Sequence, residues 1–116
     1  MHTRGIGARY EEAAAEYLAA KGYTIVQRNV ITPYGEIDIV AMDGKVLVFC
    51  EVKYRSTAKH GMALDAVDVR KQKRISKAAL YFVARREEET ACRFDVIAIG
   101  GDGEITHVEN AFDFIG

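Results

Sequence analysis

The chain has 116 residues, of which 49% are hydrophobic and 28% are charged, with one proline and a net charge of −1. This length predicts one domain, residues 1–116, and the composition is typical of a folded globular protein rather than a disordered, fibrous or disulfide-stapled one. No run of about 18 apolar residues is present, which excludes a membrane-spanning helix, and no apolar block follows Arg4 and Arg9, so we expect a cytoplasmic protein. Cys50 and Cys92 lie far apart in apolar stretches, which predicts two buried free thiols.

The predicted elements follow the order helix, three strands, helix, two strands. Ala, Glu and Leu dominate a first helix from about Ala8 to Lys21, which Gly22 ends. Turn-forming residues then separate extended, β-branched segments, and a stripe of apolar residues at helical spacing marks the second helix. The remaining predicted elements are strands at 23–31, 36–42 and 45–54, a loop at 55–63, a helix at about 64–86, and strands at 93–99 and 104–108. This order predicts an α/β fold in which two helices cover a mixed sheet.

The strand predicted at 45–54 is apolar on both faces until two charges appear at its end. One face carries valines and Cys50, and the other carries Leu47 and Phe49 followed by Glu51 and Lys53. Apolarity on both sides is typical of a central strand. A carboxylate and an ammonium at the rim of a buried strand are costly unless something pairs with them, and a metal ion is one such partner.

The preceding hairpin predicts where a second carboxylate lies. If Asp43 and Gly44 form a two-residue turn, Asp38 pairs with Phe49 and lies on the same face as Glu51, diagonal to it at about 7 Å. Two carboxylates at that separation suit a hard divalent cation such as Mg²⁺, and a neighbouring lysine can position a nucleophile or stabilise developing charge. The alternative is a surface ion pair of Glu51 with Lys53 and a solvated Asp38, but the joint pattern favours a metal site.

The near-zero net charge hides a basic segment. Between Lys53 and Lys77 eight basic residues face two acidic ones, a net charge of +6, whereas the remainder of the chain carries −7. Such a segment predicts phosphate contacts with a nucleic acid, although plain solubilisation is the alternative. The candidate nucleic-acid-binding residues are Arg55, Arg70, Lys71, Lys73, Arg74 and Lys77. Lys71 differs from the exposed ridge of this helix, because it projects toward the sheet end where Glu51 emerges.

The predicted strand at 93–99 carries two residues of opposite charge. Arg93 and Asp95 occupy alternate positions and therefore lie on one face, where they can form an ion pair. We expect that pair to be structural rather than catalytic. For His107 the sequence shows no partner.

The Gly35-Glu36-Ile37-Asp38 segment, followed thirteen residues later by Glu51-Val52-Lys53, resembles the active-site signature of the PD-(D/E)xK nuclease superfamily. The whole chain is more closely similar to the YraN-like family of small bacterial proteins, which are similar to archaeal Holliday junction resolvases. Further matching segments are the helix at 11–18, Gly22-Tyr23, Lys71 with Arg74, the Arg93-Phe94-Asp95-Val96 segment and Asn110-Ala111-Phe112.

The resemblance implies a restriction-endonuclease-like core of order αβββαβ. It also implies that Asp38 and Glu51 are ligands of Mg²⁺ or Mn²⁺, that Lys53 is the catalytic lysine, and that the first helix adds Glu11, with Glu12 as the alternative. The implied activity is a metal-dependent endonuclease acting on phosphodiester bonds of branched or structured DNA, with a homodimer as the expected assembly. The alternative is a catalytically inactive module of the same fold that binds nucleic acid or another protein.

Overall fold

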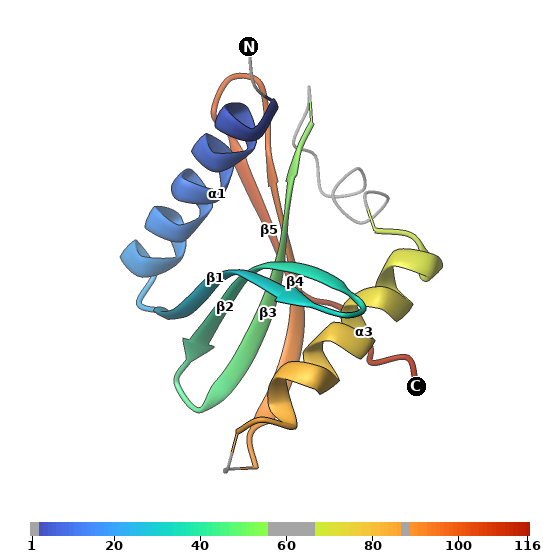
Figure 1. Cartoon of the computed structure of the whole chain (residues 1–116). Helices are drawn as coiled ribbons and strands as arrows, with labels where there is room; N and C mark the ends of the chain where they lie inside the picture. The colour runs from blue at the N-terminus through green and yellow to red at the C-terminus, as the bar shows by residue number, and fades with distance from the viewer. Residues whose placement is uncertain (1–2, 56–66, 87–88) are drawn as a thin grey trace.

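The computed structural model describes residues 3–55, 67–86 and 89–116, with side chains from Arg9 onward. Its elements are α1 (Thr3–Ala20), β1 (Thr24–Thr32), β2 (Gly35–Asp43), β3 (Val46–Tyr54), α3 (Val69–Val83), β4 (Ala91–Ile99) and β5 (Ile105–Phe112). The predicted order of helix, three strands, helix and two strands is confirmed (Figure 1). The predicted loop at 55–63 falls outside the described residues apart from Arg55.

Several element ends differ from the prediction: α1 begins at Thr3 instead of about Ala8, α3 ends at Val83 instead of about Arg86, and β4 begins at Ala91 instead of Arg93. The second helix begins at Val69 and not near residue 64, because Asp68 caps it: the Asp68 carboxylate accepts a hydrogen bond from the Lys71 backbone N–H at 2.9 Å. Residues 64–66 lie outside the described part of the chain. The last strand reaches Phe112 rather than residue 108, although Asn110 within it adopts a left-handed φ of 52°.

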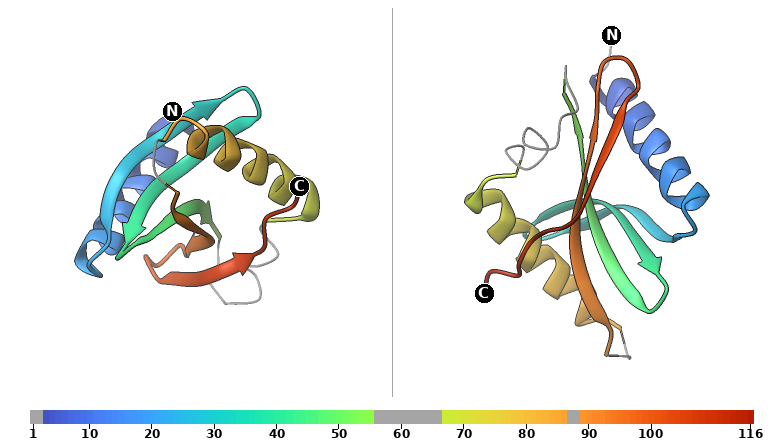
Figure 2. Two further views of the ribbon diagram at one scale, coloured as in Figure 1. Left: turned by 90° about the horizontal axis from the view of Figure 1, so that it is seen from below. Right: turned by 180° about the vertical axis from the view of Figure 1, so that it is seen from behind.

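The five strands form one mixed sheet of order β1-β2-β3-β4-β5, with β3 in the centre as predicted. Strands β3 and β4 are parallel, and the other neighbouring pairs are antiparallel. Helices α1 and α3 lie on opposite faces of the sheet (Figure 1). After β5 the chain turns toward α3, where the Ile115 backbone N–H donates to the Ser76 hydroxyl at 3.1 Å (Figure 2).

The two faces of β3 contribute to two separate hydrophobic clusters, as the sequence predicts. Leu47 and Phe49 pack in the cluster beneath α3, and Val48 and Cys50 pack in the cluster beneath α1. Cys50 is a buried free thiol, but the prediction of burial is wrong for Cys92, which is exposed near the start of β4. No helix in the described part of the chain has the length and apolarity needed to cross a membrane.

The predicted register of the β2–β3 hairpin is wrong by two residues. Asp43 pairs with Val46 and Val40 with Phe49, so the connection consists of Gly44 and Lys45. Gly44 has a φ of 60° and occupies the first central position of the turn, where a two-residue hairpin favours glycine. A shift of two residues leaves every side chain on its predicted face, because side chains alternate with a period of two.

Strands β2 and β3 separate at the end of this hairpin that lies away from the turn. Their pairing runs as far as Ile39 with Cys50, after which β2 continues with β1 and the last residues of β3 continue with β4. In Figure 1 the β1–β2 ribbon crosses toward α3, whereas the end of β3 runs away from it. Asp38 and Glu51 are the first residues of the two strands beyond this point, which we call the strand fork.

Candidate functional site

The carboxylate of Glu51 is the centre of a polar cluster at the strand fork. Its side chain is only 8% exposed, and its Oε1 lies 2.8 Å from Lys71 Nζ and 3.4 Å from Lys53 Nζ. Lys53 belongs to the same strand two residues on, and Lys71 comes from the first turn of α3. The predicted approach of Lys71 to this end of the sheet is therefore confirmed.

Asp38 lies beside Glu51 and completes the fork. Its Oδ2 accepts a hydrogen bond of 2.8 Å from the Val52 backbone N–H, a donor on the side of β3 from which β2 has departed. Burial, followed by the charges of Glu51 and Glu11, raises the pKa of Asp38 to about 7, although the Val52 N–H and Lys53 oppose the shift. The buried carboxylate of Glu51 and the partly buried carboxylate of Asp38 thus repel each other.

The pKa values of the two lysines beside Glu51 shift in opposite directions. Burial and the neighbouring Lys71 ammonium lower the pKa of Lys53, against the attraction of Glu51. The pKa of Lys71 is raised, because its contact with Glu51 outweighs the cost of burial. One carboxylate, Glu51, is therefore shared between two ammonium groups, of which Lys71 is the closer.

The first helix adds a third carboxylate near the fork. Burial and the charge of Glu36 raise the pKa of Glu11, and Glu51 contributes in the same direction. Glu12 lies elsewhere: its carboxylate pairs with Arg28 Nη1 at 2.6 Å and is largely exposed. Of the two acids that the sequence left open, Glu11 is the one whose carboxylate lies in the field of the cluster.

The basic residues predicted for nucleic acid fall into two groups. Arg70, Lys73, Arg74 and Lys77 are exposed on α3 and follow the same helix that carries Lys71 to the fork. Arg55 follows β3 directly and is half-buried, with its backbone N–H bonded to the Ile99 carbonyl at 2.9 Å. A hollow of about 180 Å³ between the β1–β2 turn and α3 is lined by Gly35, Glu36, Lys71, Arg74 and Ile75.

The donor set at the fork suits Mg²⁺ or Mn²⁺ in part. Among the described residues no three His, Cys, Asp or Glu side chains come together as a complete metal site. Magnesium, however, is commonly held by one or two carboxylates together with waters and substrate phosphates. Asp38 and Glu51 are hard oxygen donors whose mutual repulsion a cation would relieve, so these two residues would hold the ion.

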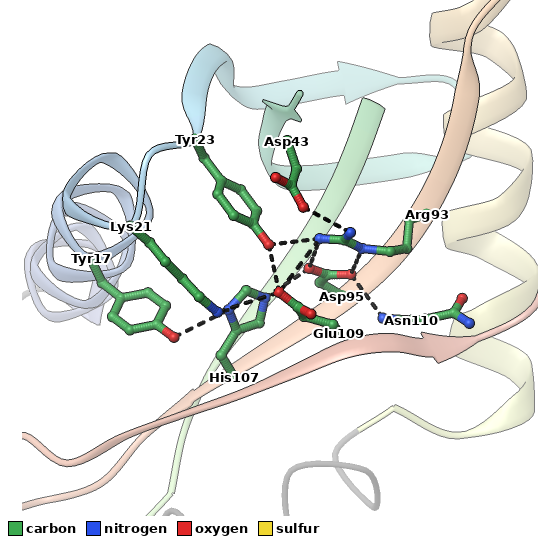
Figure 3. A network of polar contacts seen from close by, with 9 residues as sticks. All are labelled: Tyr17, Lys21, Tyr23, Asp43, Arg93, Asp95, His107, Glu109 and Asn110. Atoms are coloured by element: carbon green, nitrogen blue, oxygen red, sulfur yellow. Dashed lines mark hydrogen bonds and ion pairs between the residues drawn. The ribbon is translucent and has the colours of Figure 1, made fainter. Parts of the chain in front are cut away.

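A second polar cluster lies on the α1 face of the sheet (Figure 3). The predicted ion pair is confirmed: Arg93 binds the fully buried Asp95 through two contacts of 2.9 and 3.0 Å. The same guanidinium donates to Asp43 at 3.0 Å and to the Tyr23 hydroxyl at 2.7 Å. Although burial opposes it, hydrogen bonds from His107 and Arg93 hold the pKa of Asp95 below its usual range.

His107 is a partner that the sequence prediction missed. Its Nε2 lies 2.7 Å from Asp95 Oδ2, and its Nδ1 lies 3.2 Å from the Tyr17 hydroxyl and 3.1 Å from Lys21 Nζ. Glu109 also belongs to this cluster, and its carboxylate accepts a hydrogen bond of 2.8 Å from the Tyr23 hydroxyl. The cluster joins α1, β2, β4 and β5, so its geometry is that of a structural tie between elements (Figure 3).

Comparison with known proteins identifies a family for this chain. Residues 10–99 match the model of the uncharacterised protein family UPF0102. The chain belongs to this family. A UPF0102 protein of Thermodesulfovibrio yellowstonii is 46% identical over 107 residues, covering 92% of this chain and 95% of the relative. UPF0102 proteins of Lachnoclostridium phytofermentans and Geobacter sulfurreducens are 43% and 47% identical, covering 100% and 97% of this chain and 99% and 91% of the relatives.

Membership of UPF0102 confirms the YraN-like family that the sequence motifs indicate. The mixed five-stranded sheet with a helix on each face is consistent with the restriction-endonuclease-like core that this resemblance implies. The matched range contains the whole fork, including Asp38, Glu51 and Lys53, and it ends before His107 of the second cluster.

Proposed function

We propose that this UPF0102 protein is a metal-dependent endonuclease that hydrolyses phosphodiester bonds of branched or structured DNA. The observation that carries the proposal is the strand fork, where the partly buried Asp38 and the buried Glu51 lie together with Lys53 between two central strands. Structural ion pairs relieve electrostatic strain, whereas here burial and like charges oppose the ionisation of Asp38. Such perturbed groups cluster at functional sites.

Each residue of the fork then has a separate role. Asp38 and Glu51 would hold Mg²⁺ or Mn²⁺, an ion that, once bound, neutralises a scissile phosphate and lowers the pKa of a coordinated water. Lys53 places its ammonium beside Glu51, where it would stabilise the negative charge that develops on the phosphate. Glu11 adds a further acid from α1 that can orient a water or a second carboxylate.

The surroundings of the fork support a nucleic acid as the substrate. Helix α3 places Lys71 of its first turn at Glu51 and presents Arg70, Lys73, Arg74 and Lys77 to solvent. Its sequence from Val69 to Val83 contains no acidic residue. A row of cations that begins at the carboxylates would place a phosphate backbone along the helix without reading base sequence.

A second function is favoured by one specific contact. The carboxylate of Glu51 already has two counter-charges, Lys71 and Lys53, so this residue is paired without a metal ion. The same surface would then serve a non-catalytic module that binds nucleic acid or a protein partner through α3. The two functions differ in their response to Mn²⁺, because only the nuclease requires Lys71 to release Glu51.

The test uses the full chain with linear, flap and four-way DNA substrates in Mg²⁺ or Mn²⁺. We expect cleavage of branched substrates that disappears in EDTA and in Asp38→Ala and Lys53→Ala. Glu16→Ala, an exposed acid on α1, is the matched control and should cleave like the wild type. Cleavage that survives unchanged in both fork variants would overturn the proposal, and salt-dependent binding without cleavage would favour the non-catalytic module.

Assembly is a separate part of the proposal. A two-fold homodimer would present two forks to a symmetric branched substrate. Light scattering over a concentration series should show a mass near twice 12.9 kDa at the concentrations at which cleavage is observed. A monomer that cleaves fully would remove the dimer from the mechanism while leaving the fork assignment intact.

A further inference from the structure

A second hollow continues along α3 from the fork. It has a volume of about 320 Å³ and is lined by Tyr34, Lys77, Leu80, Tyr81 and Ala84. The first hollow, at Lys71 and Arg74, lies nearer the start of the same helix. The helix therefore carries Lys71, Arg74, Lys77 and Tyr81 in succession beside the β1–β2 turn, over about 15 Å.

The second hollow differs from the first because aromatic rings line it. Tyr34 at the β1–β2 turn meets Tyr81 edge to face, with ring centroids 6.4 Å apart and planes at 69°. The guanidinium of Arg85 covers one face of Tyr81 at 3.9 Å from the ring centroid. Tyr34 itself is 48% exposed and Leu80 is 57% exposed, so the hollow presents apolar and aromatic surface to solvent.

The exposed Tyr34 ring, the partly exposed Tyr81 ring and the neighbouring cations together identify the chemistry of an occupant. A phosphate backbone would meet Arg74, Lys77 and Arg85, whereas an apolar protein segment would gain nothing from these charges. Unpaired bases stack on aromatic side chains, but bases inside a duplex present only their edges. The charge and the rings together therefore fit an unpaired strand rather than a duplex.

We propose that the surface formed by Arg74, Lys77, Tyr34 and Tyr81, here called the tyrosine groove, holds an unpaired DNA strand next to the strand fork. Tyr34 stacks on a base, and Arg74 and Lys77 contact phosphates. This inference rests on the proposed function, since it names the substrate class as DNA with a single-stranded segment adjoining the cleaved bond.

The chain offers a direct probe of stacking, because it contains no tryptophan. Tyr34→Trp introduces a single indole whose fluorescence a stacked base would quench. The matched control is Tyr54→Trp, because Tyr54 is similarly exposed at 46% but lies at the end of β3, stacked on Tyr10 of α1. Oligothymidylate should quench the Tyr34→Trp emission and leave the Tyr54→Trp emission unchanged.

Affinity supplies the second measurement, by fluorescence anisotropy of labelled oligothymidylate and of a blunt duplex at one salt concentration. Tyr34→Ala should weaken oligothymidylate binding about tenfold, equivalent to about 1.4 kcal/mol, within the range for one base stacked on an aromatic ring. Duplex affinity should change less than twofold. Tyr54→Ala should leave both affinities as in the wild type.

Three results would overturn the tyrosine groove: unchanged oligothymidylate affinity in Tyr34→Ala, equal losses for single strand and duplex, or equal quenching in both tryptophan variants. These results are distinct from failure of the proposed function, which Asp38→Ala tests. Tyr34-dependent strand binding without cleavage would retain the groove and reject the nuclease. Cleavage that depends on Asp38 but not on Tyr34 would retain the nuclease and reject the groove.

Discussion

Replacing Asp38 by Asn should stabilise the protein while abolishing the proposed activity. The carboxylate of Asp38 is partly buried and repelled by Glu51 and Glu11, which raises its pKa to about 7. A neutral amide removes that repulsion and keeps an oxygen for the hydrogen bond that Val52 N–H donates at 2.8 Å. The amide NH₂ group has acidic neighbours that can accept hydrogen bonds, so the change leaves no obligatory unpaired donor.

The magnitude follows from the pKa. A shift from the ordinary value of 3.8 to about 7 corresponds to about 4 kcal/mol of destabilisation when the group is fully ionised, at about 1.4 kcal/mol per pKa unit. Because the pKa of Asp38 is higher in the folded state than in the unfolded state, ionisation of this group does not weaken the fold below about pH 4. The free energy of unfolding then falls as the pH rises from about 4 through about 7. We expect Asp38→Asn to raise the free energy of unfolding at pH 8 by about 1–3 kcal/mol, after the cost of placing the amide.

The assay is urea unfolding of wild type and Asp38→Asn at pH 5 and pH 8. The stability difference between the variants should be larger at pH 8, and the melting temperature should rise by about 4–8 °C for each kcal/mol. Glu16→Gln on the exposed face of α1 is the control and should change stability by less than about 0.5 kcal/mol. An effect of Asp38→Asn on stability that is equal at pH 5 and pH 8 would refute the electrostatic reasoning.

Three further predictions concern other residues of the structure. Lys71→Met should tighten Mn²⁺ binding about tenfold in calorimetry, because Glu51 loses the ammonium at 2.8 Å; unchanged or weaker binding would contradict competition for this carboxylate. Asp95→Asn should destabilise the fold by about 3–5 kcal/mol at pH 7, because Arg93 loses its buried partner. Since the folded-state pKa of Asp95 is lowered, this loss should shrink as urea unfolding is repeated at pH values falling through 4, and a constant loss would argue against it. The double variant Lys73→Ala, Lys77→Ala should lower the slope of log affinity for duplex DNA against log salt by about 2, and an unchanged slope would remove these lysines from the contact surface.

The placement of the fork residues was predictable because it depends on parity rather than on exact pairing. Side chains alternate along β3, so Glu51 and Lys53 had to lie on the face of Leu47 and Phe49. The hairpin prediction erred by two residues, an even number, and Asp38 therefore remained on the predicted face. Had the error been one residue, the two carboxylates would have been assigned to opposite faces.

The start of α3 and the second polar cluster were less accessible to sequence reasoning. Asp68 is a favourable N-cap residue in the sequence itself, but the predicted start near residue 64 did not use this local signal. His107 and Tyr17 are 90 residues apart in the chain and meet only because β5 folds back along β4 beside α1. Alternation along a longer predicted last strand would have placed Glu109 on the same side as His107, which was the one available signal.

The two polar clusters differ in a way that bears on which of them is functional. On the α1 face, Asp95 receives hydrogen bonds from Arg93, His107 and the Asn110 backbone, so its ionised form is stabilised and its pKa is lowered. At the fork, Asp38 receives one backbone hydrogen bond while burial and like charges raise its pKa. A fold that satisfies the buried Asp95 fully can do the same for the partly buried Asp38. The strain left at Asp38 is therefore a cost that function explains better than stability does, since sites that bind a cation require carboxylates whose charge is incompletely neutralised by the protein alone.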